Sequence, residues 1–303
     1  MTSKILYHLG VFMIVVTAPT GQIGSRVLGT LLERGEPIRV IARDPARLPD
    51  HVREHVEIVK GSHSDAAVVD EAFAGADTVF WLVAADRRAE SLEAAYLDFT
   101  RPACAAIEKH GVSRVVGISA LGRGFAENTG YLSASHAMDD LIAGTGVAYR
   151  ALTMPTFMDN ILWQAGSIGE EGVFFGPLSG DLRAPTCATR DIADVAAGWL
   201  LDRSWQGVAD VPVLGPEDLS QNDLAEIMSD VLGRPVRYQR VPMDAFRATQ
   251  LEHGRSKAMA QGMVDMMAAK EAGIDNAEPR TPAATTPTTF RQWCEEVLKP
   301  REW

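Results

Sequence analysis

The stretch Thr17-Ala18-Pro19-Thr20-Gly21-Gln22-Ile23-Gly24 joins an apolar run at residues 13–18 to a helical pattern at residues 24–34. A pyrophosphate can be held by backbone N–H groups and the positive end of a helix dipole, provided that the side chains of the turn are small. Gly21 and Gly24 meet this need, and Ala18 stands where the first glycine of the dinucleotide fingerprint is expected. We therefore predict a dinucleotide site here. The expected cofactor contacts come from Thr17, Ala18, Thr20, Gly21, Gln22, Ile23 and Gly24.

Short β-rich runs alternate with longer helical patterns through the first half of the chain. The runs are apolar nearly throughout, as is typical of strands covered on both faces of a parallel sheet. Strands are expected at residues 13–18, 38–42, 56–60, 78–83, 114–119 and 148–153. Helices are expected at residues 24–34, 65–73, 91–110 with a kink at Pro102, and 131–143. This alternation predicts an α/β fold of the Rossmann type, with a doubly wound parallel sheet.

After Thr153 the pattern loosens into Gly/Pro-rich loops and then becomes mostly helical. Helices are expected at residues 192–202, 222–232 with Ser220 as N-cap, 243–253, 256–272 and 289–298. A strand at residues 211–214 is expected to return to the sheet, and residues 278–288 to form a long surface connection. We predict an N-terminal extension (residues 1–12), a nucleotide domain (13–155) and a smaller, mostly helical substrate lobe (156–303).

Arg43 is the feature that indicates which nicotinamide cofactor is bound. The second strand ends in Ile41-Ala42-Arg43-Asp44, where an NAD site would usually present an acid to the ribose hydroxyls. A guanidinium at this place can pair with a 2′-phosphate and stack on adenine. The alternative is an exposed Arg43 paired with Asp44, with Asp44 reading the ribose of NADH. We expect NADPH, with NADH as the second option.

Composition excludes several other classes of protein. The chain of 303 residues has a formal net charge of -11 and no run of Lys or Arg, which argues against a nucleic-acid partner. No stretch reaches the apolar length of a membrane span, and no metal-ligand spacing is present. The three cysteines are widely spaced and cannot all pair, which favours core positions and a cytoplasmic location.

Several motifs carry a family resemblance. They are the glycine turn, Arg43, Gly75-Ala76-Asp77-Thr78-Val79-Phe80, Gly111-Val112-Ser113-Arg114-Val115-Val116 and Thr153-Met154-Pro155-Thr156-Phe157-Met158-Asp159-Asn160. Together they resemble the atypical short-chain dehydrogenase/reductases, and more narrowly the NmrA-like and quinone-oxidoreductase-like group. The resemblance implies NADPH binding, and it leaves the reaction open. The group holds quinone, ketone and double-bond reductases, reductase-like proteins of aromatic polyketide tailoring, and redox-sensing regulators that bind cofactor without turnover.

The resemblance also implies further cofactor contacts. Gly61-Ser62 replaces the Gly-Asp that often contacts adenine in this family, which leaves Ser62 or His63 for that role. Val83 and Ala84 after the fourth strand, and Pro155 and Phe157 after the sixth, are the remaining expected contacts.

The catalytic residues are less clearly marked. Common short-chain dehydrogenases use Tyr-x-x-x-Lys, in which the lysine lowers the tyrosine pKa. Here Tyr131 is followed by Ser135 in place of the lysine, so Tyr131 either takes part or only packs the helix. His136 and Asp139 share a helix face, and His136 could donate to a substrate oxygen or lie on the surface. Ser119 and Asn160 follow strands at the edge of the sheet where ligands bind, and Asn160 either fixes the loop backbone or contacts the substrate.

These residues favour hydride transfer to an acceptor that needs little acid help, such as a quinone. The expected ligand is a small aromatic or quinone substrate. Its apolar pocket, or alternatively a packed core, would be formed by Phe157, Met158, Ile161, Leu162, Trp163, Phe174 and Phe175. Two functions stay open: a reductase of a quinone or aromatic polyketide, with a second protein component as one option for a monooxygenation, and a non-catalytic NADP-binding regulator. The sequence leaves the oligomeric state open.

Overall fold

The computed structural model describes residues 12–301. Within that range seven parallel strands form one sheet in the order β10-β6-β5-β4-β1-β2-β3. Their bounds are β1 Ile14–Val16, β2 Ile38–Ala42, β3 Glu57–Lys60, β4 Thr78–Trp81, β5 Arg114–Ala120, β6 Ala148–Met154 and β10 Val208–Pro212. The order reverses beside β1, which is the arrangement of the dinucleotide-binding fold and agrees with the predicted fold class.

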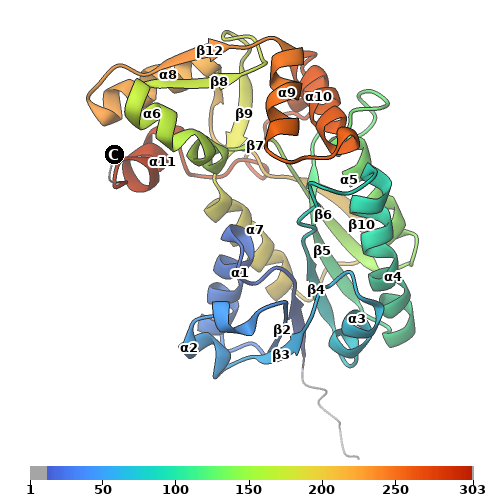
Figure 1. Ribbon diagram of the computed structural model, residues 1–303. Helices are drawn as coiled ribbons and strands as arrows, with labels where there is room; N and C mark the ends of the chain where they lie inside the picture. Colours follow the sequence, from blue (N-terminus) through green and yellow to red (C-terminus); the bar gives the residue numbers. More distant parts are fainter. Residues whose placement is uncertain (1–11, 302–303) are drawn as a thin grey trace, which may run out of the picture.

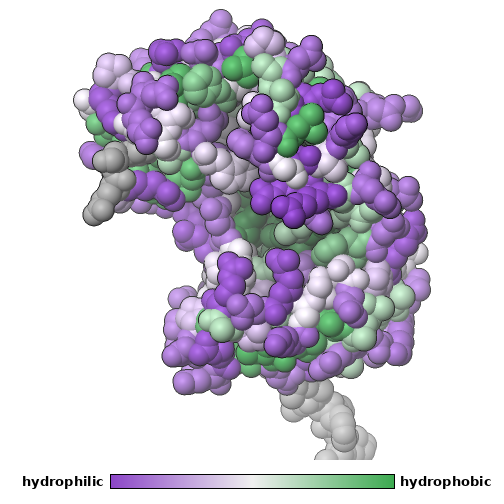
Figure 2. Space-filling view, in the orientation of Figure 1, coloured by the Kyte–Doolittle hydropathy of each residue, from purple (hydrophilic) through white to green (hydrophobic). Residues whose placement is uncertain are grey.

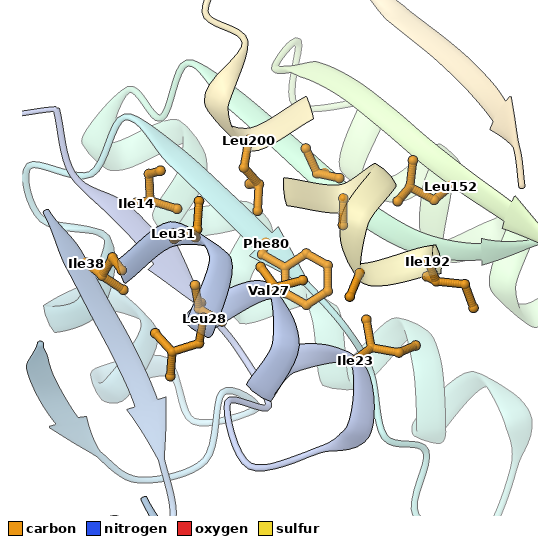
Figure 3. Close-up of a cluster of buried hydrophobic side chains, with 14 of the residues drawn as sticks. Ile14, Ile23, Val27, Leu28, Leu31, Ile38, Phe80, Leu152, Ile192 and Leu200 are labelled. Atoms are coloured by element: carbon orange, nitrogen blue, oxygen red, sulfur yellow. The ribbon is translucent and has the colours of Figure 1, made fainter. Parts of the chain in front are cut away.

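Helices cover both faces of the sheet (Figure 1). One layer holds α1 (Gln22–Glu33) and α7 (Thr189–Leu201), and the other holds α3 (Ala66–Phe73), α4 (Phe99–His110) and α5 (Tyr131–Ala143). Figure 3 shows the core under the first layer, where Val27 and Leu31 of α1 and Leu200 of α7 gather around Phe80. Burial of these apolar faces, at roughly 25 cal/mol per Å², fixes α1 and therefore the turn that precedes it.

A second part of the chain sits above the carboxyl edge of the sheet (Figure 1). Its strands form two small sheets, and its helices surround them. The bounds are β7 Thr156–Phe157, α6 Ala165–Glu171, β8 Val173–Gly176, β9 Ala184–Cys187, β11 Asp218–Leu219, α8 Gln221–Leu232, β12 Arg237–Arg240, α9 Met243–Glu252, α10 Lys257–Glu271 and α11 Phe290–Trp293. A short α2 lies at Asp50–Arg53 and π-helical turns at Ala94–Asp98 and Cys294–Leu298. Short 3-10 helices lie at Pro45–Arg47, Met158–Gln164 and Ile274–Asn276.

The six predicted strands of the first half are all present, with ends that differ by up to two residues. The predicted 211–214 strand does join the sheet, but it begins at Val208 and ends at Pro212. Because β10 is an edge strand, paired only with β6, it alternates exposed and partly buried residues and carries a weak apolar signal. No sequence pattern predicted β7, β8, β9, β11 or β12, which have two to four residues each.

Residues 278–288 form the expected surface connection only in part, because residues 279–283 are mostly exposed while the end of the segment is largely buried. Thr286 and Thr288 are buried, and Leu214 forms an isolated bridge with Thr285. The backbone N–H of Thr288 donates to Asp191 of α7 at 3.0 Å, and its hydroxyl donates to the same carboxylate at 2.6 Å. The buried Asp191 carboxylate needs hydrogen-bond donors, and Thr288 supplies two of them. These bonds hold the end of the 278–288 segment against α7.

The proposed division at residue 155 remains a prediction. Both α7 and β10 come from the predicted lobe and pack with the sheet, so the second half of the chain contributes to both parts. The predicted extension lies outside the described residues except for Phe12, whose ring lies 3.7 Å from the guanidinium carbon of Arg203. All three cysteines are free and buried, as expected of core residues.

Candidate cofactor and substrate site

The parallel sheet brings the predicted site residues to one edge. Gly21 follows β1, Arg43 follows β2, Ser62 follows β3, Val83 follows β4 and Pro155 follows β6. The carboxyl ends of parallel strands meet at the same edge, and ligands of open α/β sheets bind there. Figure 2 shows a hollow at this level, between the part with the sheet and the part above it, with apolar residues in its floor.

The turn after β1 is built around a close approach of two backbone segments. Ala18 has a positive φ of 50°, a conformation that side chains rarely adopt, and the Gly21 N–H donates to the Ala18 carbonyl at 3.1 Å. A Cβ on Gly24 would overlap the Ala18 carbonyl oxygen and lie 2.9 Å from its carbonyl carbon. Residue 24 must therefore be glycine, whereas a Cβ on Gly21 would make only an ordinary 3.4 Å contact.

The N-terminus of α1 is open to an anion. Gly21 provides no side-chain cap, and the first turn holds no acidic residue. Within residues 12–301, the N–H groups of Gln22, Ile23 and Gly24 have no protein acceptor. These donors and the helix dipole fit a pyrophosphate.

Thr17 and Ile23 face inward, although both are expected cofactor contacts. The Thr17 hydroxyl donates to Phe80 O at 2.8 Å and accepts from the Leu82 N–H at 2.9 Å, which ties the ends of β1 and β4 together. The Ile23 side chain belongs to the core. Thr17 thus shapes the turn, and Ile23 can offer only its backbone. Thr20 is half-buried and Gln22 is exposed.

Arg43 and Asp44 have different environments at the end of β2. Asp44 caps the following 3-10 helix by accepting from the Ala46 N–H at 3.1 Å. Arg43 is exposed and has no hydrogen-bond or ion-pair partner within the described part of the chain. The alternative interpretation, an Arg43–Asp44 ion pair, is therefore not realised. A free guanidinium at this edge fits a 2′-phosphate.

His63 lies near Arg43 within a cluster of aromatic rings. Its ring packs edge-on against Trp81 and Phe99 at centroid distances of 5.3 and 4.8 Å. Burial lowers the pKa of His63 to about 4, so the ring is neutral, and Nε2–H donates to Leu82 O at 3.0 Å. Ser62 lies half-buried beside it, with its hydroxyl 2.8 Å from that of Ser64.

Ser119 belongs to a buried polar network behind the site. Its hydroxyl donates to Asp139, whose other carboxylate oxygen accepts from the Tyr149 phenol at 2.7 Å. Burial raises the pKa of Asp139 to about 7, and Arg123 opposes this at 3.2 Å. In this conformation the Ser119 hydroxyl is occupied inside the protein.

His136 does not contact Asp139, although the two share a helix. Its Nε2 lies 2.9 Å from Ala120 O at the end of β5 and therefore donates to that carbonyl. Burial lowers the pKa of His136, which favours the neutral ring. The remaining nitrogen is then an acceptor, so the expected donation to a substrate oxygen is not available in this state.

Tyr131 lies beside a cation that the sequence does not place near it. Its buried phenol oxygen has no hydrogen-bond partner at bonding distance in the described structure, and its ring packs edge-on against Tyr96. Burial raises the pKa of Tyr131, while the charge of Arg255 from the α9–α10 turn acts to lower it. Arg255, and not a residue of the Tyr131 helix, is thus the cation nearest the phenol, but its charge does not offset the effect of burial.

A cavity of about 970 Å³ opens above the edge of the sheet. Its walls are mainly apolar and include six of the seven residues expected in the aromatic pocket: Phe157, Met158, Ile161, Trp163, Phe174 and Phe175. Leu162 instead packs in the core of the upper part. Among the four catalytic candidates, Asn160 lines the cavity, and its amide has no protein partner among the described residues. Ser119, Tyr131 and His136 do not line it.

The cavity wall also holds four charged residues that no sequence pattern indicated: Arg87, Arg255, Lys270 and Asp275. Lys270 and Asp275 form a buried ion pair of 2.5 Å. They lie in the C-terminal half of the chain, where no motif marks them, and only the fold brings them to the site.

Within the described residues, no helix is long and apolar enough to cross a membrane, and no three potential metal ligands cluster.

The family model described as NAD(P)H-binding matches residues 19–203 of this chain. The chain belongs to this NAD(P)H-binding family. It is 34% identical over 237 residues to (4-alkanoyl-5-oxo-2,5-dihydrofuran-3-yl)methyl phosphate reductase of Streptomyces griseus, covering 78% of this chain and 79% of the relative. It is 28% identical over 261 residues to the NAD(P)H azoreductase of Xenophilus azovorans, with coverages of 84% and 86%.

A solved structure shares the fold of this NAD(P)H-binding protein. The NADPH-dependent quinone oxidoreductase of Escherichia coli, complexed with NADPH, superposes with a TM-score of 0.75 at 21% identity, covering 92% of this chain and 98% of the other. These comparisons confirm the predicted family resemblance, NAD(P)H binding and an NAD(P)H-dependent oxidoreductase.

Proposed function

We propose that this oxidoreductase uses NADPH to reduce a flat, conjugated acceptor, a quinone or an aromatic polyketide. The observation that carries the proposal is the large apolar cavity above the carboxyl edge of the sheet, whose lining includes Thr156 and Phe157 just after β6. Aromatic walls suit a planar ligand, and an apolar lining excludes water. When bound, NADPH supplies a hydride.

The cofactor residues are assigned by what they can hold. The free N–H groups at the start of α1 would bind the pyrophosphate, and Arg43 would bind the 2′-phosphate. Ser62, Val83 and Ala84 would surround the rest of the dinucleotide. Pro155 and Phe157 would lie between it and the cavity, because they directly follow β6.

The absence of Tyr-x-x-x-Lys chemistry favours an acceptor that needs little acid help. Quinone carbonyls are strongly electrophilic, and aromatisation drives their reduction, so positioning supplies much of the rate. The acceptors named for the relatives, a butenolide and an azo compound, are also conjugated. The Asn160 amide on the cavity wall would orient the acceptor by a hydrogen bond to its oxygen.

We include in the proposal a role as the reductive part of a monooxygenation. Reduction of a quinone to its quinol gives an electron-rich ring, which O₂ can then oxygenate with or without a second protein. This extension depends on the same cavity and cofactor.

A panel of quinones tests the proposal. NADPH oxidation is followed with each quinone, with and without O₂, and the products are examined by mass spectrometry for an added oxygen. We expect quinone-dependent oxidation of NADPH and recovery of the quinol without O₂. If the protein binds NADPH but reduces none of the quinones in the panel, the function as a redox-sensing regulator is favoured instead.

A further inference from the structure

Lys270 and Asp275 form a buried ion pair in the wall of the cavity. Lys270 lies near the end of α10, and Asp275 lies in the following 3-10 helix. Their side chains are 7% and 4% exposed, and the Nζ–Oδ2 distance is 2.5 Å. Pairs as deeply buried as this are often no more stable than apolar replacements of similar volume.

The pair is also incompletely bonded. Asp275 Oδ1 is buried and has no hydrogen-bond partner, and Lys270 Nζ has one protein partner within the described residues. An ammonium carries three donors, so two remain for another ligand. Buried polar groups without partners are rare in folded proteins, and both residues line the cavity. The two remaining N–H groups of Lys270 are therefore expected to donate to an acceptor atom of a molecule in the cavity.

The fold holds this pair at the edge of the sheet. Gly273, with a φ of 93°, reverses the chain after α10. Ile274, between the two charged residues, is fully buried against Ala120 and Leu132, at the end of β5 and the start of α5. A Cβ on Gly122 would overlap the Ile274 side chain, so the two segments are in close contact. The pair is thus fixed beside the strand end that faces the nucleotide site.

We propose that Lys270, held by Asp275, binds the carbonyl oxygen of the aromatic acceptor. The acceptor is a planar molecule, because the cavity wall is mainly apolar and rich in aromatic residues. A hydrogen bond from the ammonium strengthens as the oxygen gains negative charge during reduction. This role goes further than the proposed function and depends on it for the reaction. The hydrogen bond from Lys270 to the carbonyl oxygen of the acceptor can nevertheless be tested without NADPH.

The test compares two ligands that differ in their oxygens. Equilibrium dialysis without NADPH measures the binding of 2,3-dimethyl-1,4-naphthoquinone, which has no free ring position for thiol addition, and of 2,3-dimethylnaphthalene. Removing one charge would leave the other buried and unpaired, so the variant is the double change K270M/D275N. The control is K257M, which removes an exposed lysine from the same helix.

We expect K270M/D275N to weaken quinone binding at least tenfold and hydrocarbon binding less than twofold. NADPH affinity should stay within twofold in the same variant, and K257M should match the wild-type protein in all three measurements. Equal weakening of both ligands would show that the pair only shapes the wall, and would overturn the inference. So would unchanged quinone binding, or no quinone binding by the wild-type protein.

The proposed function is decided separately, by whether the wild-type protein oxidises NADPH with this quinone. If the wild-type protein oxidises NADPH with this quinone and K270M/D275N binds the quinone as tightly as the wild-type protein does, the reductase function is retained and the role of Lys270 is rejected. If Lys270 binds the quinone through its carbonyl oxygen but the protein does not oxidise NADPH with it, the binding site is retained and the proposed reductase function is rejected.

Discussion

The carbonyl group of Ala18 fills the space that a Cβ atom on Gly24 would need. This contact holds the turn between β1 and α1 in the form that leaves the first N–H groups of the helix open. The glycine that the sequence pattern places at position 24 is therefore required by the protein itself, before any cofactor is bound.

Gly24→Ala should destabilise the free protein. The added methyl overlaps backbone atoms that cannot move without distorting the turn, so we expect a loss of about 1–3 kcal/mol in the free energy of unfolding. NADPH affinity should fall at least tenfold. Denaturant titration and calorimetry measure the two effects. Gly21→Ala is the control for stability, because its Cβ has an ordinary contact; equal destabilisation by both changes would contradict the geometry.

Arg43→Ala should change cofactor choice. An Arg–phosphate pair contributes about 1.5–3 kcal/mol, so NADPH affinity should fall about 10- to 100-fold while NADH affinity stays within twofold. Calorimetry with both cofactors measures this. Arg34→Ala, an exposed arginine at the other end of α1, should change neither affinity. Equal NADPH and NADH affinities in the wild-type protein would remove the assigned role of Arg43.

The predictable parts of the fold and of the site are those that depend on short, local patterns of apolar and glycine residues in the sequence. Apolar runs marked the central strands because burial on both faces permits only apolar residues there. The topology of such a sheet then placed Arg43 beside Gly21. Lys270 and Asp275 were not predictable, because their burial depends on packing between α10, β9 and the end of β5, and no short motif records it. The same holds for Arg255, which reaches Tyr131 from a distant turn.

His63 should make stability sensitive to acid. Its pKa is about 4 in the folded protein, against about 6.5 when unfolded, so below pH 6.5 the unfolded state binds a proton that the folded state does not. Its contribution to stability is complete above pH 6.5 and is lost as the pH falls toward 4, with a slope of up to about 1.4 kcal/mol per pH unit.

Comparison with His63→Phe isolates this contribution, because the ring site between Trp81 and Phe99 is apolar. Asp139, with its raised pKa of about 7, acts in the opposite direction: its stabilising effect is lost as the pH rises toward 7. The informative quantity is therefore the difference between the two proteins in denaturant titrations from pH 6.5 to 4.5. A difference that does not change with pH would rule out a neutral buried His63.

Tyr131→Phe should lower kcat with a quinone less than tenfold. Burial raises the pKa of the phenol, which makes it a poor proton donor at neutral pH, and the charge of Arg255 at the α9–α10 turn does not offset this effect. Less than tenfold corresponds to under about 1.4 kcal/mol of transition-state stabilisation. Steady-state kinetics decides this. A thousandfold loss would return the protein to ordinary short-chain dehydrogenase chemistry, with Arg255 in the role of the lysine.

His136 should act as a positioning residue, through its hydrogen bond to Ala120 O at the end of β5. His136→Ala removes that donor and should lower kcat with a quinone at least tenfold, because the strand end beside the site loses a buried partner. His136→Gln retains an N–H donor on a side chain of similar reach, and should restore activity to within threefold of the wild-type value. The dependence of kcat on pH should be the same in the wild-type and glutamine proteins, because the ring stays neutral. If glutamine is as damaging as alanine, or removes a limb of the pH profile, the imidazole itself takes part in proton transfer, as the sequence pattern predicted.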